Sequence, residues 1–227
     1  MARSGSDPLE RLRREIDRGL RDQADPESLL PLLARLARSA PAESEPWLYA
    51  HRHLAELGVE HDPWRAALFA RRVLAVCPDD DGAWADLGLS HSLLGNYRCA
   101  ARAYEKALSI CPENPWYAHN LGHLYDVALD RPGDALPLLE RATRTEAGEA
   151  DIAASYAHAL ARCNKLGLAK RVLKRAIRHG ATADQMALWR WLDAGAPPSG
   201  RVESRAEGRE SARKKPKRRR NGRTTGE

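Results

Sequence analysis

The 227-residue chain is poor in several residue types that particular protein classes need. It has a single phenylalanine and few β-branched residues, which argues against a β-sheet protein. Its four cysteines include no closely spaced pairs, which argues against a disulfide framework and against a zinc ribbon. No run approaches the roughly 18 consecutive apolar residues of a membrane span, so none is expected. The first residues also lack the apolar stretch of a secretory signal.

The residues that are abundant favour helices, and the positive charge lies at one end. Alanine, leucine, arginine and glutamate dominate, and 43% of residues are apolar, which is enough for a core. The formal net charge is +6, with 37 basic and 31 acidic side chains. Residues 201–227 alone carry +7, so residues 1–200 are close to neutral. The composition predicts a helical body followed by a cationic tail.

Helix start and stop signals divide the body into short segments. A capping residue before a proline marks a helix start, and this occurs at Asp7-Pro8, Asp25-Pro26, Asp62-Pro63 and Asn114-Pro115. Thr182 is expected to cap a last helix at about 183–194. Three glycines are placed to end helices: Gly58, Gly95 and Gly180. About eleven helices and no strand are expected before residue 196.

A repeat of 34 residues starts at Asp81. Counting Asp81 as position 1, the residues at positions 4, 7, 8, 11, 20, 24, 27 and 32 are Trp84, Leu87, Gly88, His91, Ala100, Tyr104, Ala107 and Pro112. The small residues permit close helix contacts, and the larger ones fill the space between helices. Pro112 ends the second helix of the unit.

Neighbouring segments repeat this pattern less completely. Residues 115–149 match if one residue is inserted in the turn near Asp130-Arg131-Pro132. Residues 150–183 match without an insertion. Residues 44–80 form a more degenerate unit, whose Cys77-Pro78 lies 34 residues before Cys111-Pro112.

These residues resemble the tetratricopeptide repeat family, with His91 in place of the usual tyrosine. The resemblance implies an all-α, right-handed superhelical solenoid of antiparallel helix pairs. The first helix of each pair would line a concave groove. Such arrays usually bind peptides or partner proteins and do no chemistry. The resemblance therefore implies an adaptor or scaffold that binds an unknown protein or peptide, without a cofactor and without enzyme activity.

The resulting organisation has seven parts. They are N-terminal helices forming a cap or degenerate repeat (1–43), a degenerate repeat (44–80), three repeats (81–114, 115–149 and 150–183), a capping helix (184–196) and a disordered basic tail (197–227). The capping helix is apolar over more than half of its circumference. An alternative is that it offers a docking surface through Trp191.

The resemblance also indicates which side chains face the groove, namely positions 2, 5, 9, 12 and 13 of each first helix. The candidate partner-binding residues at these positions are Leu89, Trp116, His119, His123, Asp126, His158 and Arg162, and Asn120, at position 6, is expected beside them. Trp116 would be an apolar anchor, and Asn120 could bond a peptide backbone. Asn120 also matches an asparagine that some family members use to hold chaperone tails. Asp151 and Ser155 stand where that site needs lysine and arginine, which argues against chaperone-tail binding.

The groove histidines allow an alternative hypothesis of metal binding. His119 and His123 are four residues apart on one helix, Asp126 follows three residues later, and His158 is expected on a neighbouring helix. The simpler interpretation is that these histidines contact a partner, in which case binding would vary between pH 5 and 7. No HExxH sequence, glycine-rich phosphate loop or nucleophile elbow indicates an enzyme.

The tail has its densest charge in one segment, with basic side chains at Arg213, Lys214, Lys215, Lys217, Arg218, Arg219 and Arg220. This segment could contact nucleic acid or the ribosome non-specifically through phosphates. It could also bind an acidic protein or membrane surface, or simply keep the chain in solution. The expected location is cytoplasmic, or nuclear if the chain is eukaryotic, because the segment would then act as an import signal.

Overall fold

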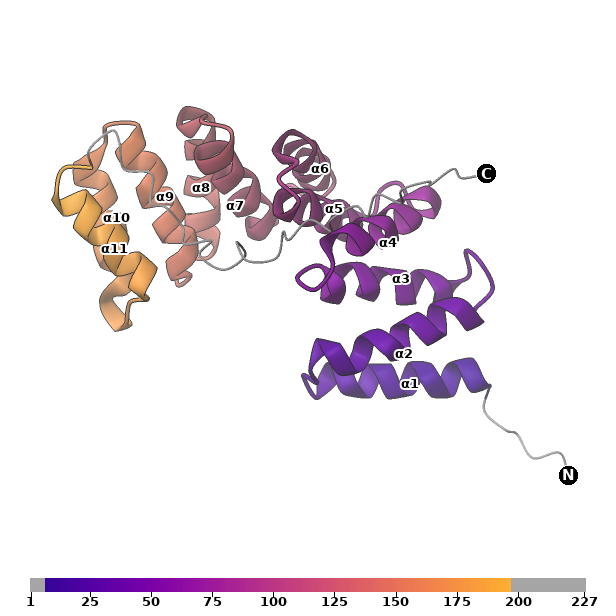
Figure 1. Ribbon diagram of the computed structural model, residues 1–227. Coiled ribbons are helices and arrows are strands. Elements are labelled where there is room, and N and C mark those ends of the chain that lie inside the picture. Colours follow the sequence, from indigo (N-terminus) through magenta and orange to yellow (C-terminus); the bar gives the residue numbers. More distant parts are fainter. Residues whose placement is uncertain (1–6, 197–227) are drawn as a thin grey trace, which may run out of the picture.

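The computed structural model describes residues 7–196, and these form helices and no strands (Figure 1). The α-helices are α1 (Pro8–Arg21), α2 (Pro26–Ser39), α3 (Glu45–Gly58), α4 (Pro63–Val76), α5 (Asp81–Leu93), α6 (Tyr97–Ile110), α7 (Pro115–His123), α8 (Pro132–Thr145), α9 (Ala150–Arg162), α10 (Leu166–Ala176) and α11 (Ala183–Asp193). A π-helix, η1 (Leu124–Ala128), continues α7, and a 3₁₀ turn, η2 (Ile177–His179), follows α10. The predicted all-α class is confirmed, and the basic tail lies outside the described residues.

The helices pack as sequential pairs, from α1 at one end of the array to α10 and α11 at the other (Figure 1). Each helix contacts the next one in the chain, and α3 also contacts α5 while α7 contacts α9. The first helices of successive pairs therefore lie side by side. We call the surface formed by α3, α5, α7 and α9 the A-helix face.

Hydrogen bonds connect two helices of this face to each other and a third to the capping helix α11. The Tyr117 hydroxyl on α7 donates to the Asp81 carboxylate on α5 at 2.9 Å. The Gln185 amide on α11 donates to the Asp151 carboxylate on α9 at 2.8 Å. These partners are 36 and 34 residues apart in sequence, so each bond joins one repeat to the next.

The predicted helix starts are confirmed by side-chain caps. Oxygens of the predicted capping residues accept bonds from backbone N–H groups in the first turns of α1, α2, α4, α7 and α11. Thr182 forms a reciprocal capping box with Gln185. Gly95 and Gly180 follow helices with φ of +75° and +140°, as a helix stop requires.

Gly58 ends α3, as predicted, but it does so without the left-handed conformation of a helix-stop glycine. It is the last residue of α3, it is buried, and the next residue, Val59, still has helical angles. An added Cβ at Gly58 would contact Leu30 of α2 at 3.7 Å. Its small size therefore matters for packing against α2, and the chain leaves the helix without a left-handed residue.

The small signature residues allow the two helices of a pair to approach closely. A Cβ added at Gly88 would lie 3.0 Å from ring carbons of Tyr104 on α6, which is itself 2% exposed. A Cβ added at Gly122 would lie 2.7 Å from Leu139 of α8. At the eighth position of the repeat, the space beside the glycine is therefore filled by a side chain from the partner helix, as the sequence pattern predicts.

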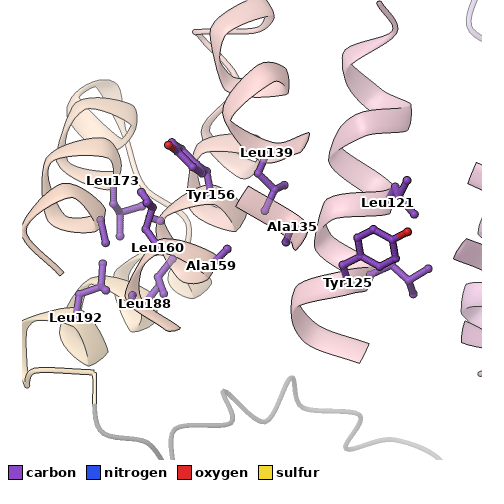
Figure 2. Packing of buried hydrophobic residues seen from close by; sticks show 14 of the residues in the cluster. Leu121, Tyr125, Ala135, Leu139, Tyr156, Ala159, Leu160, Leu173, Leu188 and Leu192 are labelled. Carbon is purple, nitrogen blue, oxygen red and sulfur yellow. The ribbon is translucent and has the colours of Figure 1, made fainter. Parts of the chain in front are cut away.

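The buried apolar side chains of the described residues form separate clusters along the array. One continuous cluster runs from α6 to α11 and includes Leu121, Leu139, Leu160, Leu173 and Leu192 (Figure 2). Another joins α1, α2 and α3 around Ile16, Leu33 and Leu36. A smaller cluster lies between them. Each repeat is thus stabilised mainly by its neighbours.

The one-residue insertion predicted near Asp130-Arg131-Pro132 is accommodated largely before the turn. The backbone N–H of Leu129 donates to the carbonyl of Leu124, which is the i to i+5 bond of a π-helix. A π-helix contains more residues per turn than an α-helix, so it takes up an extra residue without breaking the helix. Asp130 then begins the turn with φ of +55°.

Within residues 7–196 no helix is both long and apolar enough to cross a membrane.

Candidate functional site on the A-helix face

Trp116 is the most exposed aromatic side chain on the A-helix face among the candidate residues, at 47%. It lies in the first turn of α7, where the Asn114 side chain accepts its backbone N–H at 3.0 Å. Its ring meets the His119 ring edge-on, with 6.4 Å between centroids. An exposed indole held on a rigid helix is suited to contact a partner.

His119, Ser155 and His123 form a hydrogen-bonded group between α7 and α9. The Ser155 hydroxyl lies 3.0 Å from His119 Nε2 and 3.3 Å from His123 Nδ1. Because a hydroxyl donates one bond and accepts another, it can serve both rings. The His119 Nδ1 atom is buried and has no hydrogen-bond partner among the described residues.

Burial determines the protonation of these histidines. Burial, together with the nearby His123, lowers the pKa of His119 to about 4. Burial also lowers the pKa of His123, although the Asp126 carboxylate acts in the opposite direction. His119 is therefore neutral between pH 5 and 7, so it does not supply the pH dependence expected from the sequence.

Asp126 lies beneath the surface rather than on it, because its side chain is only 1% exposed. His158 Nδ1 lies 2.5 Å from one carboxylate oxygen, and Arg162 Nη1 donates to the other at 3.0 Å. Arg162 also donates to the backbone carbonyl of Asp126 and to the Asp130 carboxylate. The polar groups of Asp126 and Arg162 bond to each other and join η1 to α9, so a role of these two residues in partner binding stays a prediction.

The remaining candidates border this network. The His158 ring stacks on the Trp191 ring of α11, with 5.3 Å between centroids. Asn120 is half-buried and close enough to Tyr104 and His119 to affect the pKa of both. Leu89 is half-buried and packs against the large apolar cluster. Trp116 and the histidines thus lie together, whereas Leu89 belongs mainly to the core.

The metal hypothesis finds no support in this arrangement. His119 and His123 each use a ring nitrogen on Ser155, and His158 uses one on Asp126. Among residues 7–196 no group of three or more His, Cys, Asp or Glu side chains is arranged to hold a metal ion.

A cavity of about 410 Å³ opens on the same face, between α3, α5 and α7. Its lining residues are Tyr49, Arg52, His53, Glu56, Asp80, Gly82, Ala83, Ala85, Asp86 and Tyr117. None of them is among the candidate binding residues from the sequence. The small residues Gly82 and Ala85 are the only sequence signal for this cavity. Its opposite wall is formed by α3 of the degenerate repeat, and the repeat pattern does not specify which residues of that helix face the groove.

The charges of this cavity are only partly compensated. Arg52 Nε donates to Asp80 at 2.6 Å, and His53 Nδ1 lies 3.2 Å from Glu56. No basic side chain within residues 7–196 forms an ion pair with the third carboxylate, Asp86. Burial, together with the negative charges of Glu56 and Asp80, raises the pKa of Asp86 to about 7.

Comparison with solved structures shows which fold this is. MamA 41-end from Desulfovibrio magneticus RS-1 is 22% identical, with a TM-score of 0.62 over 82% of this chain and 97% of that one. YrrB, described as a TPR protein with an unusual peptide-binding site, is 21% identical, with a TM-score of 0.59 over 71% of this chain and 82% of that one. At these identities the likeness concerns the fold.

Comparison of sequences gives one match. The tetratricopeptide repeat family matches residues 81–124, which include α5, α6 and α7. No curated protein matches the chain. One segment thus carries the sequence pattern of the tetratricopeptide repeat family, and the described helices pack with the fold of the MamA and YrrB structures.

Proposed function

We propose that this protein is an adaptor or scaffold that binds a peptide or a partner protein on its A-helix face. Tetratricopeptide arrays generally bind proteins or peptides and are typically not enzymes, and we infer that this one has no catalytic activity of its own. The observation that carries the proposal is the exposed Trp116 ring beside the His119–Ser155–His123 group. It combines an apolar contact with hydrogen-bonding atoms on rigid helices.

The test compares two exposed tryptophans on different helices. Full-length wild-type, Trp116→Ala and Trp64→Ala proteins are immobilised, exposed to native lysate with nuclease, and the retained proteins identified by mass spectrometry. Trp64 is a matched control because it is 62% exposed on α4, the second helix of its pair. We expect wild-type and Trp64→Ala to retain the same proteins and Trp116→Ala to lose them. Equal retention by all three proteins would contradict Trp116 as the anchor.

A second function is favoured by one feature of the sequence, the seven basic side chains between Arg213 and Arg220. We propose as an alternative that this segment contacts nucleic acid through phosphates, with an affinity that falls steeply with salt. Replacing its seven basic residues by glutamine in the full chain separates the two functions. Loss of retained material in this variant, or on nuclease treatment, would favour the alternative, while retention would favour the A-helix face.

A further inference from the structure

The cavity between α3, α5 and α7 exists because two groove positions carry almost no side chain. Gly82 and Ala85 are the second and fifth residues of α5. The same two positions of α7 carry Trp116 and His119. A Cβ added at Gly82 would meet no atom closer than 3.5 Å, so the position is open rather than tightly packed. The array therefore leaves space in one repeat where the next carries large rings.

The walls of this space combine rings with excess negative charge. Tyr117 is fixed by its bond to Asp81, and Tyr49 by its bond to Asp17. Arg52 is engaged by Asp80, which leaves the Asp86 carboxylate with no basic partner in the described helices. A carboxylate in a partly desolvated space is stabilised by an added cation. Arginine fits best, because its planar guanidinium pairs with carboxylates and stacks on aromatic rings.

We propose that this cavity binds an arginine side chain of a partner segment, with Asp86 as its counter-charge. The inference rests on the proposed function, because it specifies the chemistry of the partner held on the A-helix face. The cavity and Trp116 lie at the same end of α7, since Tyr117 lines the cavity and directly follows Trp116 in the first turn. One bound segment could therefore place an arginine in the cavity and an apolar residue on Trp116.

Binding of arginine would depend on pH through Asp86. Because Asp86 has a pKa of about 7, it is mostly neutral at pH 6 and mostly ionised at pH 8. The affinity for a cation should therefore rise by about tenfold between these pH values. The charged and titratable groups around Asp86 are Arg52, His53 and Glu56 on α3, Asp80 before α5, Tyr104 on α6 and Tyr117 on α7. His53 also lines the cavity, so the dependence must be shown to require Asp86.

The test uses the ¹⁵N-labelled full-length protein and two synthetic probes at low salt. The first is acetyl-Gly-Arg-Gly-amide, and the second replaces arginine with citrulline, which is neutral and of similar shape. We expect the arginine probe to shift amide signals of residues 82–86 and to bind at least about tenfold more tightly than the citrulline probe. Equal affinities, absence of binding, or shifts confined to other helices would overturn the proposal.

Two substitutions sharpen the result. Asp86→Asn should weaken arginine binding by about tenfold at pH 8 and remove its pH dependence. Glu113→Gln, which changes an exposed acid outside the cavity, should leave both unchanged. The spectrum of unbound Asp86→Asn reports whether it folds, and the arginine–citrulline comparison tests the proposal in the wild-type protein in any case. Unchanged binding in folded Asp86→Asn would contradict the role of this carboxylate.

The basic segment of this chain, residues 213–220, could itself occupy the cavity in place of a partner. The full-length variant with its seven basic residues changed to glutamine tests this alternative. Equal probe affinity in this variant and in wild-type supports a cavity open to a partner. A gain of about tenfold in the variant would show that the chain's own segment fills the cavity, which overturns the assignment. If arginine fails to bind but Trp116→Ala still loses partners, only this inference fails. If arginine binds while Trp116→Ala retains its partners, the Trp116 anchor fails instead.

Discussion

Asp86 and Asp126 are carboxylates in the same array with opposite surroundings. Asp126 is 1% exposed and is met by His158 and Arg162, whereas Asp86 faces a cavity with two other carboxylates. A buried charge needs a partner to offset its lost hydration. Asp126 has its partners within the fold, whereas Asp86 has no basic partner among the described residues and can pair with a cation of a ligand.

We therefore predict that removing the charge of Asp86 stabilises the free protein at high pH. The folded-state pKa is about 7 against an ordinary value of 3.8, so the fold favours the neutral form. The associated stability is present below about pH 4 and is lost as the pH rises through 7. Asp86→Asn should raise the free energy of unfolding at pH 8 by at least about 1 kcal/mol and change it little at pH 4.

Urea denaturation at pH 4, 6 and 8 measures this difference. Glu113→Gln is the control, because Glu113 is exposed and outside the cavity, and should show no comparable pH-dependent change. If Asp86→Asn has the same stability difference from wild-type at all three pH values, the carboxylate does not titrate as described.

At the scale of single elements, the segment from α7 through η1 shows where sequence reasoning succeeds and where it fails. The extra residue is detectable because the 34-residue spacing requires it after Gly122. Its location in a π-helix is not detectable, since the same spacing fits an insertion in the turn. The wider turn of η1 changes the direction of the side chains that follow Leu124, so the position count does not foresee the burial of Asp126.

Other features of the structure also differ in whether the sequence predicts them. Helix starts are predictable because a capping side chain and the N–H groups it accepts are close in sequence, as at Asn114 and Thr182. The cavity is not predictable, because Asp86 and Glu56 come from different repeats and one repeat is degenerate. The helix starts can thus be predicted from local sequence signals, whereas the cavity depends on contacts between residues of different repeats.

We predict that Arg162 is needed to hold η1 against α9. It donates to the Asp126 carboxylate and carbonyl and to Asp130, so Arg162→Ala leaves the buried Asp126 charge with less compensation. The expected loss of stability is about 2–4 kcal/mol, with faster hydrogen exchange at the amides of 124–130. Arg65→Ala is the control, because Arg65 and Asp62 form an exposed pair expected to contribute less than about 1 kcal/mol. Equal losses in the two variants would refute the special role of Arg162.

At the scale of the whole molecule, the apolar clusters are arranged in a row rather than around one centre. The cluster of α1 to α3 and the cluster of α6 to α11 share no residue. In such arrays stability is a sum of local terms, and damage stays near its origin. A partner that spans several repeats would couple segments that are otherwise only loosely connected.

We predict that core substitutions at the two ends act independently. Leu33 and Leu160 are each at most 1% exposed, in the first and second cluster respectively. Leu33→Ala should cost about 2–5 kcal/mol and accelerate amide exchange in α1 to α3 without affecting α9 to α11. Leu160→Ala should give the reverse pattern. Uniform acceleration along the chain in either variant would indicate a single cooperative unit.

The hydrogen bonds that join one repeat to the next also bear on how the molecule responds to force. The bonds Tyr117–Asp81 and Gln185–Asp151 run across the stack, between helices that are far apart along the chain. Tension applied at the two ends would act on these interfaces in series with the same force, so the weakest interface would open first. The array would lengthen in steps of about one helix pair and recoil as contacts re-form, so it would behave as a soft spring between whatever its two ends hold.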